Sequence, residues 1–176
     1  MLIAALIAGL AMTECTTIDD FSGDEFGRWR TVNDGVMGGR SDGSARVKDG
    51  VMVFEGNINT NGGGFSSVRR GLQGMEGATH IEALVEGDGR AYELIFQTNE
   101  RYRGRRVTYR AALTSETHDE PQTVRAELSD MPTTIFGRSV RAADFDASDA
   151  VEIGIILADG EDGPFELKVH KISYCR

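Results

Sequence analysis

The sequence has little of what a catalytic or metal site is usually built from. Among its 176 residues are three histidines and two cysteines. His80, His118 and His170 lie far apart, and none has a neighbour at His-x3-His spacing, nor is there a Cys-x2-Cys pair. Because protein zinc sites use such closely spaced ligands, the sequence predicts no metal and no cofactor. It favours a protein that binds a partner and is not an enzyme.

Positive charge is also scarce. Lysine and arginine total 19 against 28 aspartates and glutamates, which gives a formal net charge of −9. A nucleic-acid-binding domain needs a basic face, so the composition argues against a nucleic-acid partner. One local exception is Arg101–Arg106, with four arginines in six residues. It is interpreted either as a solvated loop between strands or as a contact for phosphate or an acidic partner.

Long hydrophobic runs are missing except at the start. Met1–Met12 is apolar, but a membrane-spanning helix takes about 20 residues. The run has the length of a secretory signal core, with Gly9 and Ala11 as small residues before a cleavage point, yet no basic residue precedes Arg28. We therefore divide the chain into an apolar leader, residues 1–15, and one domain, residues 16–176. A periplasmic or exported location is favoured over a cytoplasmic one.

The two cysteines, Cys15 and Cys175, stand near opposite ends of the chain. If the first and last strands of the domain lie side by side, these cysteines can form a disulfide. Such a bridge would close a very long loop and stabilise the fold by about 3–5 kcal/mol in an oxidising compartment. Two free thiols are the equally weighted alternative.

Proline is rare, with 3 residues, whereas glycine is abundant, with 22. Short apolar-alternating segments separated by glycine- or aspartate-rich turns predict an all-β sandwich or jelly roll of seven to nine strands. The predicted strands are 51–54, 80–86, 92–97, 107–113, 124–128, 151–157 and 165–174. The last one changes phase, which predicts a β-bulge near His170 and Lys171. Short helical turns are expected at 71–77 and 142–148.

Aromatic residues make up only 7% of the chain, and glycan binding usually needs exposed aromatic faces. Most aromatics fall on predicted strands, where they are expected in the core. The sole tryptophan, Trp29, is interpreted either as core or as part of a contact surface. The acidic stretch Asp159–Gly163 lacks the ligand spacing of an EF-hand, so it is interpreted as a hairpin tip. A calcium site is the alternative.

The most informative segments are two glycine-rich stretches, Trp29–Gly43 and Phe54–Arg69. Glycine allows positive backbone φ angles and close approach of two chain segments, so we expect two loops packed together at one end of the sandwich. Each stretch carries one arginine, Arg40 or Arg69, beside uncharged hydroxyls. A buried ion pair between Asp34 and one of these arginines is the preferred interpretation, and contact with a ligand or partner is the alternative.

These stretches resemble the complex I intermediate-associated protein 30 family. The resemblance is carried by Val32-Asn-Asp-Gly-Val-Met-Gly-Gly-Arg-Ser41, by Phe54-x-Gly, and by Gly63-Gly-Phe-Ser-Ser-Val-Arg69. Weaker matches follow in the family's order at 87–92, 123–131, 136–138 and 153–165, so the resemblance covers about residues 19–175.

The resemblance implies a galactose-binding-like jelly-roll β-sandwich. It also implies a chaperone-like role in respiratory complex I assembly, with protein assembly intermediates, including membrane-associated ones, as partners. The alternative implied by the same fold is a carbohydrate-binding module of the bacterial cell envelope, with a glycan partner. We expect the binding surface between residues 33 and 69, together with the adjoining tryptophan. Its candidate residues are Trp29, Asn33, Asp34, Met37, Arg40, Ser41, Phe65, Ser66 and Arg69.

Overall fold

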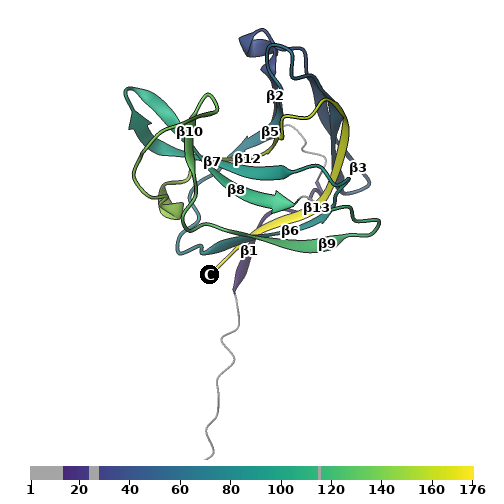
Figure 1. Cartoon of the computed structure of the whole chain (residues 1–176). Coiled ribbons are helices and arrows are strands. Elements are labelled where there is room, and N and C mark those ends of the chain that lie inside the picture. Colours follow the sequence, from purple (N-terminus) through teal and green to yellow (C-terminus); the bar gives the residue numbers. More distant parts are fainter. Residues whose placement is uncertain (1–13, 24–27, 115) are drawn as a thin grey trace, which may run out of the picture.

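Residues 14–23, 28–114 and 116–176 are described by a computed structural model, and most of them lie in β-strands (Figure 1). The strands are β1 (Cys15–Asp19), β2 (Trp29–Asn33), β3 (Asp42–Lys48), β4 (Val51–Ile58), β5 (Ser66–Gly71), β6 (His80–Glu86), β7 (Tyr92–Tyr102), β8 (Arg105–Thr114), β9 (Gln122–Glu127), β10 (Thr133–Ile135), β11 (Arg138–Ser139), β12 (Glu152–Leu157) and β13 (Gly163–Cys175). Two 3-10 turns, η2 (Asp34–Met37) and η3 (Ala147–Asp149), precede β3 and β12. In the described part of the chain, no helix is long and apolar enough to cross a membrane.

The strands form two antiparallel sheets that pack face to face. The six-stranded sheet has the order β3-β4-β13-β6-β9, with β1 beside the C-terminal part of β13. The seven-stranded sheet has the order β11-β10-β8-β7-β12-β5-β2. In Figure 1, β1, β6 and β9 lie at the bottom of the view, and β2, β5 and β10 lie at the top.

The core lies between the sheets because successive side chains of a strand point to opposite faces. In β6, Ile81 and Val85 are fully buried on the inner side, and in β7 Tyr92 is 1% exposed on the facing side. The ring of Phe165 joins the two layers, since its centroid lies 4.9 Å from that of Phe54 and 6.4 Å from that of Tyr92. Each such aromatic contributes about 1.5–3 kcal/mol through burial.

β13 is the central strand of the six-stranded sheet. Its first part pairs with β4, its last four residues pair with β1, and β6 runs along its other side. A disulfide joins Cys15 in β1 to Cys175 in β13. The register of β13 against β6 shifts between Val169 and Lys171, which confirms the predicted β-bulge. The bulge explains why Val169 and Ile172, three residues apart, both point into the core.

The all-β sandwich predicted from the sequence is confirmed, and each predicted strand lies on an observed one. The helical turn expected at 71–77 is wrong. The amides of Leu72, Gly74 and Met75 donate to carbonyls at 147–151 and not to carbonyls of their own turn. The turn expected at 142–148 is reduced to η3. Residues 1–13 of the predicted leader, 1–15, lie outside the described residues.

The arginine-rich segment 101–106 was interpreted as a loop between strands, but most of it lies in strands. β7 continues to Tyr102 and β8 starts at Arg105, which leaves a two-residue turn. Arg103 and Gly104 both have positive φ angles, 51° and 80°. Two consecutive positive φ angles are the requirement of a type I′ hairpin turn. The arginines therefore lie at the end of a β-hairpin with a two-residue turn.

Candidate functional site

Two glycine-rich loops, residues 34–41 and 59–65, are held together by the carboxylate of Asp34. We refer to them as the Asp34 loop pair. One carboxylate oxygen, Oδ1, accepts a hydrogen bond from the Ser41 amide at 2.9 Å. The other, Oδ2, accepts from the Ser41 hydroxyl at 2.5 Å, the Gly64 amide at 2.6 Å and the Phe65 amide at 3.3 Å. A single buried side chain thus satisfies four donors from both loops.

The charged form of Asp34 is maintained although the residue is fully buried. Burial opposes ionisation, but the hydrogen bonds from Ser41, Gly64 and Phe65 outweigh it and hold the pKa of Asp34 below its usual value. Hydrogen bonds to a carboxylate stabilise its ionised form. Asp34 is therefore a charged anchor of the fold near neutral pH.

Glycine is required at two positions beside this carboxylate. A Cβ atom at Gly39 would lie 2.2 Å from Cγ of Asp34, and one at Gly63 would lie 2.3 Å from its Oδ2. Neither distance is sterically possible, so only glycine lets the backbone of each loop approach the carboxylate. The Asp-Gly-Val-Met-Gly-Gly-Arg-Ser sequence is therefore first of all a structural motif.

The expected ion pair between Asp34 and an arginine is wrong. Four donors from the backbone and Ser41 already surround the carboxylate, and they leave no room for a guanidinium group. Arg69 lies on β5, not in a loop, and its ion pair is with Glu152, at 3.6 Å. Arg40 is exposed in the loop that follows η2.

The candidate binding residues divide into a buried and an accessible set. Asp34, Ser41 and Ser66 are buried, and Trp29 is 4% exposed, with its indole N–H donating to Asp19 at 2.9 Å. Trp29 is thus a core residue and not part of a contact surface. Met37 and Arg40 are exposed, while Asn33, Phe65 and Arg69 are half-buried.

Ser41 also lies in a Gly-x-Ser-x-Gly sequence, Gly39–Gly43, a pattern that the sequence reasoning overlooked. In a hydrolase this pattern places an exposed serine on a turn between a strand and a helix. Here β3 follows the serine, and the Ser41 hydroxyl is buried and donates to Asp34. The serine is held as part of the anchor and is not positioned as a nucleophile.

Large apolar side chains are exposed at the end of this loop pair. Val36 is 75% and Met37 52% exposed, both on η2, whose C-cap Gly38 has a left-handed backbone conformation. Among the described residues the other large hydrophobic side chain so exposed is Phe136, at 67%, in the turn between β10 and β11. Sequence alternation does not reveal these three residues, because all lie in turns.

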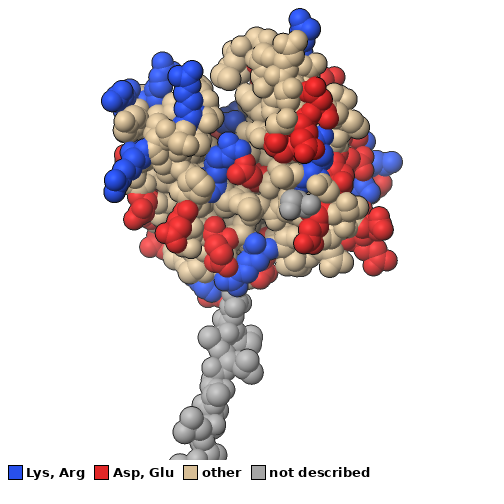
Figure 2. Space-filling view, in the orientation of Figure 1, with Lys and Arg blue, Asp and Glu red and all other residues tan. Residues whose placement is uncertain are grey.

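The outer face of the seven-stranded sheet forms the floor of a hollow, visible at the top of Figure 2 between two raised parts. β10 and the end of the β7–β8 hairpin form the left part, and β2 with the turn that follows it forms the right part (Figures 1 and 2). Strand pairing places Arg69, Gly154, Ile95 and Arg110 side by side across this floor. The neighbouring side chain Ile156 is 7% exposed and Ile95 is 2% exposed.

Charged groups on this floor are unevenly paired. Glu152 accepts from Arg30 at 2.5 Å and also lies 3.6 Å from Arg69, so one carboxylate serves two guanidinium groups. Burial lowers the pKa of Arg69 below its ordinary value, although Glu152 beside it acts in the opposite direction. Arg110 forms an ion pair with Glu93.

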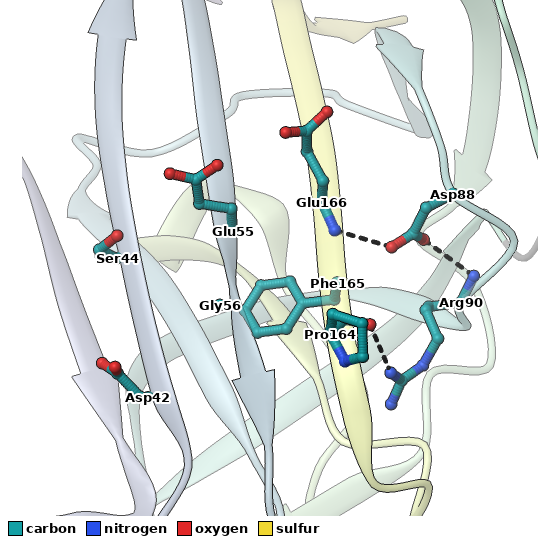
Figure 3. Close-up of a pocket in the computed structure, with 9 residues that line it drawn as sticks. All are labelled: Asp42, Ser44, Glu55, Gly56, Asp88, Arg90, Pro164, Phe165 and Glu166. Carbon is teal, nitrogen blue, oxygen red and sulfur yellow. Dashed lines mark hydrogen bonds between the residues drawn. The ribbon is translucent and has the colours of Figure 1, made fainter.

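A second depression, of about 670 Å³, lies on the outer side of the six-stranded sheet (Figure 3). Its lining residues are Asp42, Ser44, Glu55, Gly56, Asp88, Arg90, Pro164, Phe165 and Glu166. The side chain of Asp88 is used structurally, since it accepts from the amides of Arg90 and Glu166 and from the hydroxyl of Tyr92.

The acidic hairpin at 159–163 borders this depression. Arg90 donates to both carboxylate oxygens of Asp159, at 2.6 and 2.8 Å, and to the carbonyls of Glu161 and Pro164. The Arg90 guanidinium holds the pKa of Asp159 below its usual value. Because Asp159 is occupied in this way, the hairpin is fastened by an arginine and does not present this carboxylate to a cation.

Metal-ligating side chains are not gathered elsewhere in the described part of the chain, apart from Cys15, Glu82 and Cys175. The two sulfur atoms of that group are consumed by the disulfide. His170 contacts Glu86 at 2.7 Å, and His80 is buried against Thr79, at 2.9 Å. These histidines lie at separate places on the six-stranded sheet.

Comparison with known proteins gives a family match and several structural matches. The family model described as Complex I intermediate-associated protein 30 (CIA30) matches residues 19–169. No match was found among curated proteins.

Among solved structures, the fold is similar to a family 11 carbohydrate-binding module from Clostridium thermocellum, solved in complex with a β-1,3-1,4-mixed-linked tetrasaccharide. That match has a TM-score of 0.64 and 14% identity, and it covers 91% of this chain and 94% of the module. The family 11 module of the cellulosomal cellulase Lic26A-Cel5E of the same organism matches with a TM-score of 0.63 and 14% identity, covering 92% and 94% of the two chains. At these identities the likeness concerns the fold alone.

Proposed function

Because this chain belongs to the Complex I intermediate-associated protein 30 family, we propose that it is a non-catalytic domain that holds protein assembly intermediates. The binding surface is the exposed side of the Asp34 loop pair. Met37 and Arg40 contact the partner, together with Val36, which precedes Met37 on the same turn. Asp34, Ser41 and Ser66 hold the surface in shape from beneath.

The observation that carries this proposal is the exposure of Val36 and Met37 on an anchored turn. Single exposed apolar side chains are common, but neighbouring ones that form a patch mark interaction sites, and methionine and arginine are enriched in protein interfaces. The four hydrogen bonds to Asp34 keep the turn in one conformation. A preformed surface binds with a smaller loss of conformational entropy.

Two features support a non-catalytic role and an exported location. Asp34 and Ser41, the polar groups at the centre of the family motif, satisfy each other inside the fold and do not face a cleft. The Cys15–Cys175 disulfide is of the kind that persists in oxidising compartments. We therefore propose a periplasmic or exported location.

The alternative function, a carbohydrate-binding module, is less favoured by the site. Glycan-binding faces present aromatic rings to the sugar. On the outer face of the seven-stranded sheet, the paired positions that the structure describes carry arginine, glutamate, glutamine, serine, threonine, glycine and aliphatic residues but no aromatic ring. A glycan array probed with the purified domain tests this alternative, and specific glycan binding would replace the protein-partner proposal.

The assembly role is tested in the native host by deleting the gene and restoring it with variants. Loss of complex I, or accumulation of its membrane-arm intermediates on a native gel, is the expected effect of deletion. Met37→Asp is expected to restore assembly poorly although the protein stays folded, because the substitution places a charge in the apolar contact. Thr123→Asp, an exposed position on β9, is the matched control. Unchanged complex I after deletion would refute the role.

A further inference from the structure

We propose that the outer face of the seven-stranded sheet binds an acidic segment of the partner protein, whose carboxylates pair with the arginines of this face. The inference rests on the proposed function, because it names the chemistry of the partner that the domain holds. The segment would lie in the hollow between the two raised parts seen in Figure 2.

The first support is the charge of the face, which strand register defines. Residues on one side of a strand recur at every second position, and paired residues of antiparallel strands share a side. The register places five arginines but two glutamates on this face: Arg30, Arg69, Arg101, Arg106 and Arg110 against Glu93 and Glu152. The chain as a whole carries a formal charge of −9, so this excess of positive charge is local.

The second support is the shortage of carboxylates at the floor. Glu152, with a side chain 10% exposed, is shared by Arg30 and Arg69, and the Arg69 side chain is itself only 17% exposed. Arg69 is half-buried and shares its carboxylate with Arg30, so its charge is incompletely neutralised in the unbound protein, which is unfavourable. A carboxylate of a partner would complete the pairing.

The third support is the basic end of the β7–β8 hairpin. Arg101 and Arg106 lie directly opposite each other, and neither forms an ion pair within the described residues. Like charges at directly opposed positions of an antiparallel pair destabilise the sheet. Arg105, by the same alternation, points to the other side of the hairpin, where it lies over the exposed ring of Phe136, 5.0 Å from the ring centroid. This wall of the hollow therefore offers two positive charges that have no carboxylate partner within the described residues.

These features favour an acidic peptide over the other anionic partners. The aliphatic side chains Ile95 and Ile156 lie between the arginines of the floor but are only 2% and 7% exposed, so the accessible groups of the floor are mainly its arginines. A segment rich in acidic residues matches this surface. A nucleic acid would need a continuous basic surface, and the rest of this protein is acidic.

A dye-labelled peptide in which glutamate and serine alternate is the direct probe, measured by fluorescence anisotropy with the purified, disulfide-bonded chain. We expect saturable binding that weakens as sodium chloride is added, and no binding of the same peptide with glutamine in place of glutamate. The double variant Arg101→Glu/Arg106→Glu is expected to bind about tenfold more weakly or worse. Arg46→Glu/Arg125→Glu changes the net charge equally on the other sheet and is expected to bind like the wild type.

Three results would overturn the inference. They are equal binding of the glutamate and glutamine peptides, equal loss of binding in both double variants, and binding of phosphatidylglycerol vesicles without binding of the peptide. If the Arg101→Glu/Arg106→Glu chain does not fold, Arg30→Gln replaces it, because the Arg30 side chain is 58% exposed. Several-fold weaker binding by Arg30→Gln supports the inference, and unchanged binding refutes it.

The peptide assay separates this inference from the proposed function. Normal complex I after gene deletion would refute the assembly role. The peptide assay would then still show whether this face binds an acidic segment. Conversely, full restoration of assembly by Arg101→Glu/Arg106→Glu would keep the assembly role and refute the acidic segment as its partner.

Discussion

Replacing Asp34 is expected to cost more stability than any other single substitution in the glycine-rich loops. Asp34→Ala removes the acceptor of four hydrogen bonds and leaves the amides of Ser41, Gly64 and Phe65 without this partner, while the Ser41 hydroxyl keeps the Asn59 carbonyl at 3.3 Å. Hydrogen bonds to charged groups contribute about 1.5–3 kcal/mol each, and rearrangement and water entry recover part of their sum. The expected loss in the free energy of unfolding is about 3–5 kcal/mol.

Asp34→Asn gives a smaller and more diagnostic effect. The asparagine carbonyl can occupy the position that accepts from three donors, which leaves its NH2 group facing the amide of Ser41. The hydrogen bond from the Ser41 amide is lost, and two donors, this amide and the asparagine NH2 group, then face each other. The three remaining hydrogen bonds are made to a neutral oxygen in place of a charged one. The expected loss is about 1–2 kcal/mol.

Urea unfolding followed by fluorescence of Trp29, the sole tryptophan and a core residue, measures both variants. Because the pKa of Asp34 is lowered in the folded state, its contribution is complete above its unfolded value of 3.8 and is lost as the pH falls through the folded value. The difference between wild type and Asp34→Asn should therefore be large at pH 7 and shrink in acid. An Asn variant as stable as the wild type at pH 7 would refute the anchor.

Four further substitutions, one of them a control, are measured by the same unfolding assay. Gly63→Ala should lose about 2–4 kcal/mol of unfolding free energy, because its Cβ would collide with Asp34. Gly35→Ala is the control: no atom lies within 4 Å of the added Cβ, so stability should change by less than about 0.5 kcal/mol. Cys15→Ser should lose about 2–5 kcal/mol and remove the effect of reductant on the urea midpoint; a midpoint insensitive to both would argue against a stabilising bridge. Arg90→Met should lose about 2–4 kcal/mol and speed amide exchange at 159–164, because it leaves the carboxylate of Asp159 unpaired; unchanged exchange would contradict the fastening role of Arg90.

The fold could be predicted largely from alternation of apolar residues. His80–Glu86 was predicted with the observed bounds because Ile81, Ala83 and Val85 mark the buried side clearly. The strands β1, β2, β3, β5, β10 and β11 were not predicted. Of these, β2, β3 and β11 are edge strands, which have short apolar patterns, and β5 was expected to belong to a glycine-rich loop. The bulge in β13 was predictable because a shift of one residue moves every later side chain to the other face.

The site was harder to predict, because its chemistry depends on contacts between distant segments. The sequence placed Asp34 near an arginine, but the amides of Gly64 and Phe65, some thirty positions away, were the actual partners. Backbone donors carry no residue signature, so no sequence pattern distinguishes them from a guanidinium group. Arg30 and Glu152, 122 positions apart, meet only through the order of strands in the sheet.

The position of β13 determines when this domain can fold. As the middle strand of its sheet, β13 pairs with β4 and β6, and its last residues also pair with β1. β4 and β6 are synthesised long before the strand that separates them, so the sheet stays open until β13 is available. The domain should therefore acquire protease resistance in one step, when β13 joins the sheet.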